Sequence, residues 1–235
     1  DVALQDLKVI FCLDRAGLVG QDGPTHHGVF DLAYMRPIPN LVISAPYNEH
    51  ELRNLMHTAV YGNDGPFVIR YPRGQGEIPE WHNKPRVLPI GKGRTLKKGK
   101  DLALLSIGTI GNSAARAIAE AEKTGISIAH YDMVFLKPID EELLKKVAEK
   151  FKYIITVEEG IKKGGLGSAV LEFLADNGYP GRQVFRVGID DQFVTHGTIK
   201  ELQAITGIDE AGILQMIRRV EETIREENPI ELIHR

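Results

Sequence analysis

Residues 7–28 read LKVIFCLDRAGLVGQDGPTHHG, an apolar run that leads directly into a loop rich in glycine, charge and imidazole. Residues 7–13 form a short, continuously apolar stretch, which is typical of a buried β-strand. The loop that follows holds four glycines, an arginine, two histidines and two aspartates within residues 14–28. Open sheets of parallel strands bind ligands beyond the carboxyl ends of their strands. This loop is therefore the strongest candidate for a functional site.

The pattern on the C-terminal side of this stretch alternates between strands and helices. Further strands are expected at Leu41–Ala45, Phe67–Arg70, Leu102–Ile107, Ile126–Tyr131, Tyr153–Val157 and Val184–Val187. Helices are expected between Pro46 and Gly62, where Asn48 is the N-cap and Glu51 completes a capping box, and at residues 112–123, 140–151 and 167–177, with two more at the end of the chain. This alternation predicts an α/β fold of doubly wound, mainly parallel sheets.

Residues 74–100 interrupt that alternation. The segment contains several prolines and glycines and few apolar runs, which predicts a linker followed by an edge hairpin around Lys98-Gly99. We therefore expect two doubly wound domains, residues 1–86 and residues 87–235.

Composition limits the class of protein. Hydrophobic residues make up 43% of the 235 residues and charged residues 26%, as in ordinary soluble globular proteins. The formal net charge of −3 does not favour a nucleic-acid partner. The single cysteine, Cys12, lies within an apolar run and is expected to be a small buried side chain in a reducing compartment. With neither a membrane-length apolar stretch nor a signal pattern, we expect a cytoplasmic protein without a membrane partner.

Four residues in the strand-end loops are the candidate site. Arg15 and Arg73 each follow a strand, and two guanidinium groups that converge on one crevice suit a phosphate or a carboxylate. Either arginine could instead pair with a local carboxylate such as Asp14 or Asp22. His26 lies four residues after Asp22 across a Gly-Pro turn, so the pair could share a pocket and transfer protons; alternatively, His26 is a loop histidine bonded to backbone.

Weaker signals occur elsewhere. The pair His26-His27 has no further ligand at metal-binding spacing, so no metal site is expected there. The stretch Gly164–Ser168 resembles a phosphate-binding turn before a helix, but close strand-to-helix packing is the favoured explanation. Glu158 and Glu159 could form an acid pair, although half-solvated structural carboxylates are favoured. His196 is a further loop histidine, for which a structural role is favoured.

Several blocks together resemble the 1-deoxy-D-xylulose-5-phosphate synthase family over nearly the whole chain. The blocks are DRAG at 14–17, GQDGPTH at 20–26, NDGP at 63–66, RYPRG at 70–74, LPIG at 88–91, FLKPID at 135–140 and TVEE at 156–159. That family is similar to transketolase and to the β subunits of 2-oxo acid dehydrogenases. The resemblance implies the latter half of a pyrimidine-binding domain followed by a transketolase-type C-terminal domain.

The resemblance also implies an activity. The family uses thiamine diphosphate and Mg²⁺ to condense pyruvate with D-glyceraldehyde 3-phosphate, giving 1-deoxy-D-xylulose 5-phosphate and CO₂, and a homodimer is the default assembly. By resemblance, Arg15 and Arg73 bind the acceptor's phosphate, while Asp22 and His26 contact its hydroxyl and carbonyl groups and assist proton transfer. A dianionic phosphate matches two guanidinium groups, and carboligation needs a proton for the new alkoxide.

The family's Gly-Asp-Gly diphosphate motif and its cofactor-activating glutamate are not found in these 235 residues. We therefore expect a C-terminal portion that is inactive alone and holds few or none of the cofactor ligands. Two alternatives are kept: the β subunit of a 2-oxo acid dehydrogenase or another transketolase-family half, and a non-catalytic binding or regulatory module.

Overall fold

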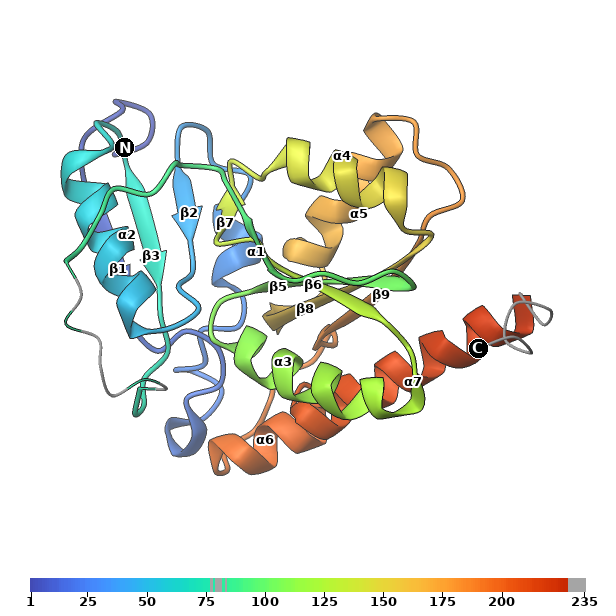
Figure 1. The fold of residues 1–235 in the computed structure, drawn as a ribbon. Helices are drawn as coiled ribbons and strands as arrows, with labels where there is room; N and C mark the ends of the chain where they lie inside the picture. The colour runs from blue at the N-terminus through green and yellow to red at the C-terminus, as the bar shows by residue number, and fades with distance from the viewer. Residues whose placement is uncertain (77, 79–81, 83, 228–235) are drawn as a thin grey trace.

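The computed structural model describes residues 1–76, 78, 82 and 84–227, which fold around two β-sheets. The strand order is β1-β3-β2-β7 in the first sheet and β4-β6-β5-β8-β9 in the second. In Figure 1 the first sheet stands on the left beside α2, and the second lies between α4 and α5 above it and α3, α6 and α7 below it. The α/β fold with mainly parallel sheets is confirmed.

The first sheet is built from the N-terminal third of the chain and one later strand. Its parallel strands are β1 (Ile10–Leu13), β2 (Val42–Ser44) and β3 (Phe67–Arg70), and β7 (Phe135–Lys137) pairs antiparallel with β2. Its helices are α1 (Asp31–Met35) and α2 (Glu49–Tyr61). The predicted N-cap of α2 is confirmed, because the Asn48 side chain accepts a hydrogen bond from the Glu51 amide at 3.0 Å.

The second sheet supplies the larger part of the core. Its strands are β4 (Arg94–Lys97), β5 (Leu102–Ile107), β6 (Ile128–Asp132), β8 (Tyr153–Ile161) and β9 (Gln183–Ile189). Its helices are α3 (Ile110–Ala121), α4 (Glu141–Lys150), α5 (Leu166–Asp176), α6 (Ile199–Thr206) and α7 (Glu210–Glu227), with short 3₁₀ turns η1 (Gly20–Asp22) and η2 (Glu122–Thr124). All six residues of β5 are buried, as expected for a parallel strand covered on both faces.

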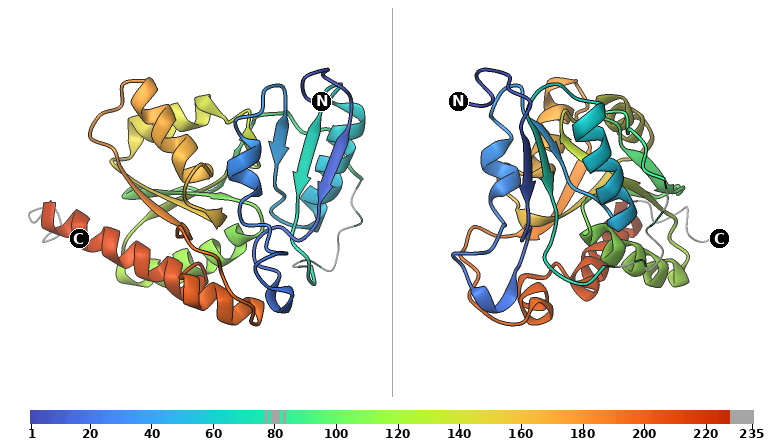
Figure 2. Two further views of the ribbon diagram at one scale, coloured as in Figure 1. Left: turned by 180° about the vertical axis from the view of Figure 1, so that it is seen from behind. Right: turned by 90° about the vertical axis from the view of Figure 1, so that its left-hand side faces the viewer.

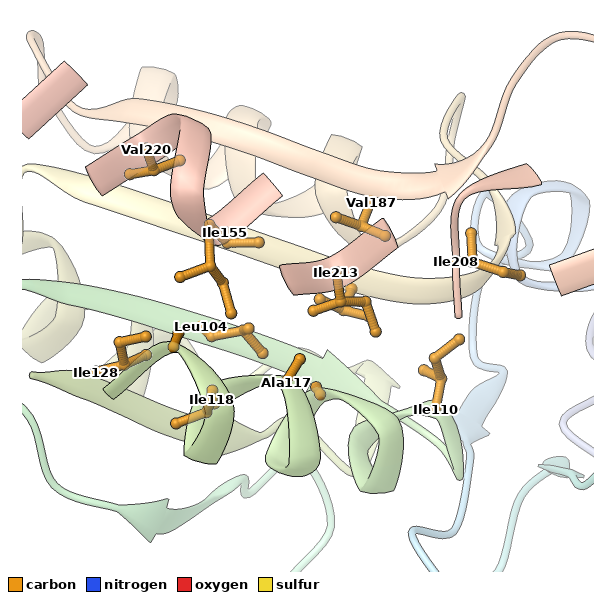
Figure 3. Close-up of a cluster of buried hydrophobic side chains, with 14 of the residues drawn as sticks. Leu104, Ile110, Ala117, Ile118, Ile128, Ile155, Val187, Ile208, Ile213 and Val220 are labelled. Carbon is orange, nitrogen blue, oxygen red and sulfur yellow. The ribbon is translucent and has the colours of Figure 1, made fainter. Parts of the chain in front are cut away.

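Alternate residues of β5 face two different cores. Leu104 packs with α3, α6 and α7 in the cluster of Figure 3. Leu105 faces the opposite side, in a cluster that contains residues of α4 and α5 and also Ile43 of the first sheet. The two sheets therefore share a continuous apolar core, and the turned views of Figure 2 show them side by side. This shared core fixes the first sheet's loops relative to the second.

The hairpin expected around Lys98-Gly99 is wrong. β4 pairs antiparallel with β6 and is not a neighbour of β5. The connection crosses the start of β6 so closely that a Cβ on Gly99 would lie 2.1 Å from the Ala129 amide nitrogen. Pairing with β6 places β4 at the edge of the sheet, where its exposed residues are tolerated.

Charged groups also join the two parts of the chain. Arg94 binds Glu51 of α2 and Asp132 of β6, at 2.8 Å in each case, and both carboxylates are almost fully buried. Burial, together with repulsion from Glu51, raises the pKa of Asp132 to about 8. Because β7 also pairs with the first sheet, contacts cross the expected limit between residues 86 and 87, and the limit itself stays a prediction.

Two further observations concern the chain's surface. Cys12 is exposed, with its Sγ 3.9 Å from the Met56 Sδ, so the expectation of a buried cysteine is wrong. The reason is that β1 is an edge strand of its sheet and has a neighbouring strand on one side only. In the described ranges, none of the helices has both the length and the apolar character needed to cross a bilayer.

Candidate functional site

The loops after β1 and β3 begin next to each other because these two strands are parallel neighbours. Leu13 pairs with Arg70 at the carboxyl ends of the strands. The contact continues beyond the sheet, where the Tyr71 amide donates to the Leu13 carbonyl and the Ala16 amide donates to the Tyr71 carbonyl, both at 3.0 Å. The residues just after each strand are therefore held together by backbone hydrogen bonds.

The structure brings three of the four candidate residues together. One carboxylate oxygen of Asp22, Oδ2, accepts a hydrogen bond from Arg73 Nη1 at 2.9 Å and lies 3.7 Å from Arg15 Nε. The Asp22 carboxylate thus lies between two guanidinium groups, and Asp14 approaches Arg15 at 3.8 Å. The convergence expected from the strand order and the local pairing expected as its alternative are both present.

This cluster is open to solvent. The exposed fractions of the side chains are 41% for Arg15, 35% for Asp22 and 60% for Arg73. Ion pairs as exposed as these contribute about 0–1 kcal/mol to stability. The cluster therefore adds little to folding. Two guanidinium groups face two carboxylates, Asp22 and Asp14, so the charges of the cluster balance, and a further anion would bind to the exposed guanidinium N–H groups.

Arg15 itself is held in an unusual state. Its backbone has φ +62°, a left-handed conformation that is strained for a residue with a side chain. Its Nε atom is buried and has no hydrogen-bond partner among the described residues. Buried donors are almost always paired, but the carboxylate oxygen nearest to this N–H, Asp22 Oδ2, lies 3.7 Å away, beyond hydrogen-bond distance.

The turn that presents Asp22 is η1. Gly20, its first residue, and Gly23, the residue after it, adopt φ of +82° and +79°, which favour glycine. A Cβ on Gly20 would lie 3.1 Å from the Gly197 carbonyl oxygen, so the turn packs closely against the segment before α6. The His196 singled out in the sequence also lies in this segment, with its Cβ 3.6 Å from the position of a Cβ on Gly23.

His26 lies in the same loop and is exposed. Its amide donates to the Gly23 carbonyl at 3.0 Å, and its Nδ1 is 3.0 Å from the Thr25 hydroxyl. Among the described residues no hydrogen bond or ion pair joins its ring to Asp22 or to either arginine of the cluster. Its proton-transfer role stays a prediction.

The neighbouring His27 is buried, and the hydrogen bonds of its ring go to other parts of the chain than the cluster. Its Nδ1 accepts from the Val19 amide at 3.1 Å, and its Nε2 lies 3.2 Å from the Thr195 carbonyl oxygen. His27 therefore ties the loop to the segment that follows β9.

The base of the loop rests on residues that the sequence analysis did not assign. Arg70, 4% exposed, donates to Asp31 at 2.7 Å, to the Gly28 carbonyl at 2.8 Å and to the Glu159 carbonyl at 2.6 Å. Gly17 lies so close to Glu159 that a Cβ would be 2.3 Å from its Cδ. The position of Arg70 at the end of a buried strand was the sequence feature from which this structural role could have been predicted.

The glycine-rich turn before α5 is occupied by the protein itself. Glu158 accepts hydrogen bonds from the Leu166 amide at 2.8 Å and the Gly167 amide at 2.9 Å, at the helix N-terminus where an anion would bind. Burial raises the pKa of Glu158 to about 7, and that of Glu159 is also raised by burial. The expectation that these carboxylates are half-solvated is wrong, because the long strand β8 carries both into the core.

No cluster of three or more His, Cys, Asp or Glu side chains in the described part of the chain has the arrangement of a metal site. The anion-binding capacity lies at the carboxyl ends of β1 and β3.

Fold and site together define a two-domain, transketolase-like α/β protein. Residues 1–78 match the model of the transketolase pyrimidine binding domain, and residues 91–213 match that of the transketolase C-terminal domain. A solved structure described as a split gene transketolase, inactive beta4 tetramer, superposes with a TM-score of 0.81 at 31% identity, covering 92% of this chain and 68% of that one. The chain belongs to the transketolase family.

Within that family, the chain is similar to 1-deoxy-D-xylulose-5-phosphate synthases. That of Bacteroides fragilis is 58% identical over 98% of this chain, and that of Phocaeicola vulgatus 59% identical over 92%. These alignments cover 35% and 34% of the two relatives, so the chain spans about a third of their length. The resemblance carried by the sequence blocks is confirmed. A transketolase mutant from Pichia stipitis, 17% identical with a TM-score of 0.72 over 97% of this chain and 32% of its own, supports the fold alone.

Proposed function

We propose that this chain is the acceptor-binding part of a thiamine-diphosphate-dependent synthase that condenses pyruvate with D-glyceraldehyde 3-phosphate to 1-deoxy-D-xylulose 5-phosphate and CO₂. The observation that carries the proposal is the Asp22 carboxylate between Arg15 and Arg73 at the carboxyl ends of two parallel strands. The names of the relatives support this reaction within the transketolase family.

In this proposal the two arginines hold the phosphate of the acceptor. Arg73 offers a guanidinium side chain that is 60% exposed, and Arg15 offers one that is 41% exposed. Asp22 keeps both cations in place before the phosphate arrives and then faces the acceptor's hydroxyl groups. Hydrogen bonds between charged groups are worth about 1.5–3 kcal/mol each, enough for selection of a phosphorylated acceptor.

His26 is the proposed proton donor and acceptor. Forming the new carbon–carbon bond turns the aldehyde oxygen of the acceptor into an alkoxide, which must receive a proton. The exposed ring of His26, in the loop that carries Asp22, is within the same strand-end region. Imidazole is the side chain best suited to transfer a proton near neutral pH.

When bound, thiamine diphosphate with Mg²⁺ supplies the electron sink for decarboxylation in this class of reaction. Because the family's Gly-Asp-Gly motif is not among these 235 residues, we place most of the ligands of this group outside them, and we propose that the chain alone is inactive. The solved relative described as an inactive tetramer supports this part of the proposal. A homodimeric assembly and a cytoplasmic location also belong to the proposal.

The alternative within the family is a β subunit of a 2-oxo acid dehydrogenase or another transketolase half. Two arginines around one carboxylate favour a phosphorylated acceptor over a lipoyl group. A purely non-catalytic module has no need of an exposed cluster of charged side chains of this kind, since the cluster contributes little to stability. No described contact favours that module.

A chimera provides the test. These 235 residues replace the matching third of the Bacteroides fragilis synthase, and condensation is measured with pyruvate, D-glyceraldehyde 3-phosphate, thiamine diphosphate and Mg²⁺. We expect turnover by the chimera and none by the chain alone. Arg73→Ala should raise the KM for the phosphorylated acceptor by about tenfold or more, given the loss of a charged hydrogen bond.

Arg116→Ala is the matched control for Arg73→Ala, since Arg116 is 52% exposed and pairs with Glu210 away from the loop. It should leave the KM unchanged. A chimera that folds but makes no product, or an Arg73→Ala variant with an unchanged KM, would refute the proposal.

A further inference from the structure

His27 connects two segments that are far apart in the sequence. Its ring is 8% exposed and lies between the Val19 amide, in the candidate site's own loop, and the Thr195 carbonyl, in the segment between β9 and α6. One residue thus joins the first sheet's loop to the part of the chain matched by the C-terminal domain model. The proton-transfer and phosphate-binding roles proposed above make no use of it.

The hydrogen bonds define which ring nitrogen carries the hydrogen. The Val19 amide can only donate, so Nδ1 of His27 accepts and carries no hydrogen. The hydrogen of the ring is then on Nε2, where it donates to the Thr195 carbonyl oxygen. The ring is a neutral spacer of fixed tautomer, with an acceptor on one side and a donor on the other.

The acceptor side leads directly to Asp22. Val19 is the N-cap residue of η1, and its own side chain makes no capping hydrogen bond. The His27 ring holds the Val19 amide, and Asp22, three residues later, ends the same turn. The position of the Asp22 carboxylate therefore depends on where this turn begins.

The donor side is attached to a segment that is anchored by Val194, while Phe193 and Thr195 on either side of it are exposed. Val194 is buried in the core between the second sheet and its helices, and Phe193 meets Phe30 edge to face at 5.9 Å between ring centroids. Two residues after Thr195, the carbonyl oxygen of Gly197 lies so close to Gly20 that a Cβ on Gly20 would be only 3.1 Å from it. This segment is a support against which the ring can set the turn.

From these contacts we infer that His27 is a positioning residue, through which the segment between β9 and α6 places Asp22 between Arg15 and Arg73. The inference rests on the proposed function for the identity of the ligand. It assigns the C-terminal domain a part in shaping the acceptor site, by a side chain that does not touch the acceptor.

The first experiment determines the tautomer of the His27 ring in the unaltered protein. Nitrogen-15 NMR of the imidazole should show an unprotonated Nδ1 and a protonated Nε2 in His27. A protonated Nδ1 would overturn the inference. This measurement needs no variant, so it decides the question even if substitutions at this position prevent folding.

The second experiment separates the two hydrogen bonds. In His27→Asn the amide oxygen can replace Nδ1 as the acceptor for Val19, whereas in His27→Gln the longer amide can replace Nε2 as the donor to Thr195. We expect the Val19 amide to exchange its hydrogen about tenfold faster in His27→Gln than in His27→Asn, which is the effect of losing one hydrogen bond. Inorganic phosphate, used as the probe, should bind more weakly to His27→Gln than to His27→Asn.

His57→Gln is the matched control, because His57 lies on α2, where its ring packs at 4.6 Å from that of Tyr61. It should change neither exchange at Val19 nor phosphate affinity. Equal phosphate affinity in both His27 variants and the parent would overturn the inference. If the parent binds no phosphate and Arg73→Ala changes nothing, the proposed function fails instead, and the tautomer and exchange results still decide whether His27 holds the turn.

Discussion

The loop after β1 and the turn after β8 contain similar residues but use them in opposite ways. Both follow strands of mainly parallel sheets, β1 at a partly exposed edge and β8 fully buried, and both combine glycines with charged side chains. After β1, Asp22 and the arginines on either side of it face solvent. Within β8, Glu158 reaches the turn that follows the strand and binds the first amides of α5, where it is 1% exposed. Glu158 binds the helix amides inside the protein, whereas Asp22 leaves both of its guanidinium partners partly exposed and so accessible to an anion.

The same contrast separates two arginines only three residues apart. Arg70 ends β3 and makes three hydrogen bonds in the interior, whereas Arg73 makes one to Asp22 at the surface. The first holds the loop in place, and the second is available to a ligand. Position relative to the end of the strand decides between these roles, because the strand is buried and the loop is not.

The largest expected effect is a loss of stability on replacing Arg70, compared with the loss on replacing Arg73. Arg70→Ala leaves the buried Asp31 carboxylate without its cation, and removing one member of a buried ion pair costs about 3–5 kcal/mol. Arg73→Ala should cost about 0–1 kcal/mol, as for exposed pairs. Urea unfolding of both variants measures the difference. Similar losses of stability in the two variants would contradict the comparison.

Replacing the glycines next to Glu158 and Arg73 by alanine should change the stability of the protein less. A Cβ on Gly165 would lie 1.9 Å from Glu158 Oε2, so Gly165→Ala should destabilise the protein by about 1–3 kcal/mol, as overpacking does. A Cβ on Gly74, beside Arg73, would meet no atom within 4 Å, so Gly74→Ala should have almost no effect. Thermal and urea unfolding measure the stability of the two variants. A clear loss of stability in Gly74→Ala would show that the loop around Gly74 is packed against other residues.

A further expected effect is a dependence of the protein's stability on pH. Burial raises the pKa of Glu158 from its usual 4.5 to about 7, despite two amides that favour the ionised form. The folded protein therefore holds this proton more tightly than the unfolded chain, so its stability falls as the pH rises from about 4.5 towards 7 and levels off above that. Relative to Glu158→Gln, the loss should be at most about 1.4 kcal/mol per pH unit.

Unfolding of both proteins in urea at a series of pH values measures this dependence. The Gln variant should lack the decline between pH 4.5 and 7, the window given by the two pKa values. A difference between the two proteins that stays constant with pH would mean that Glu158 is ionised throughout.

Much of the secondary structure followed from local patterns. The strand at residues 67–70 and the strand at 102–107 were predicted with the bounds that the structure has, since continuous apolar runs between turn residues leave few alternatives. β7 and α1 were not predicted. β7 has three residues, and its partner β2 lies some 90 residues earlier in the chain, so no local pattern could indicate the pairing.

The candidate site likewise has features that local sequence predicts and features that depend on distant contacts. The approach of Arg15 to Arg73 could be expected, because parallel neighbours place their following loops together. That Asp22 would lie between them depends on η1, and η1 depends on contacts with residues near 195–199 that no nearby sequence specifies. The burial of His27 beside an exposed His26 likewise comes from packing against that distant segment.

The sequence by itself determined the family, the alternation of strands and helices, and the residues that could bind an acceptor, because these depend on residue type and on spacing along the chain. Only the tertiary structure decided which charged groups stay open and which are used within the protein. Arg73 and Glu158 are equally polar as residues, but one lies past the sheet and the other inside it. Burial and hydrogen bonding, which depend on residues distant in sequence, assign one to a ligand and the other to the fold.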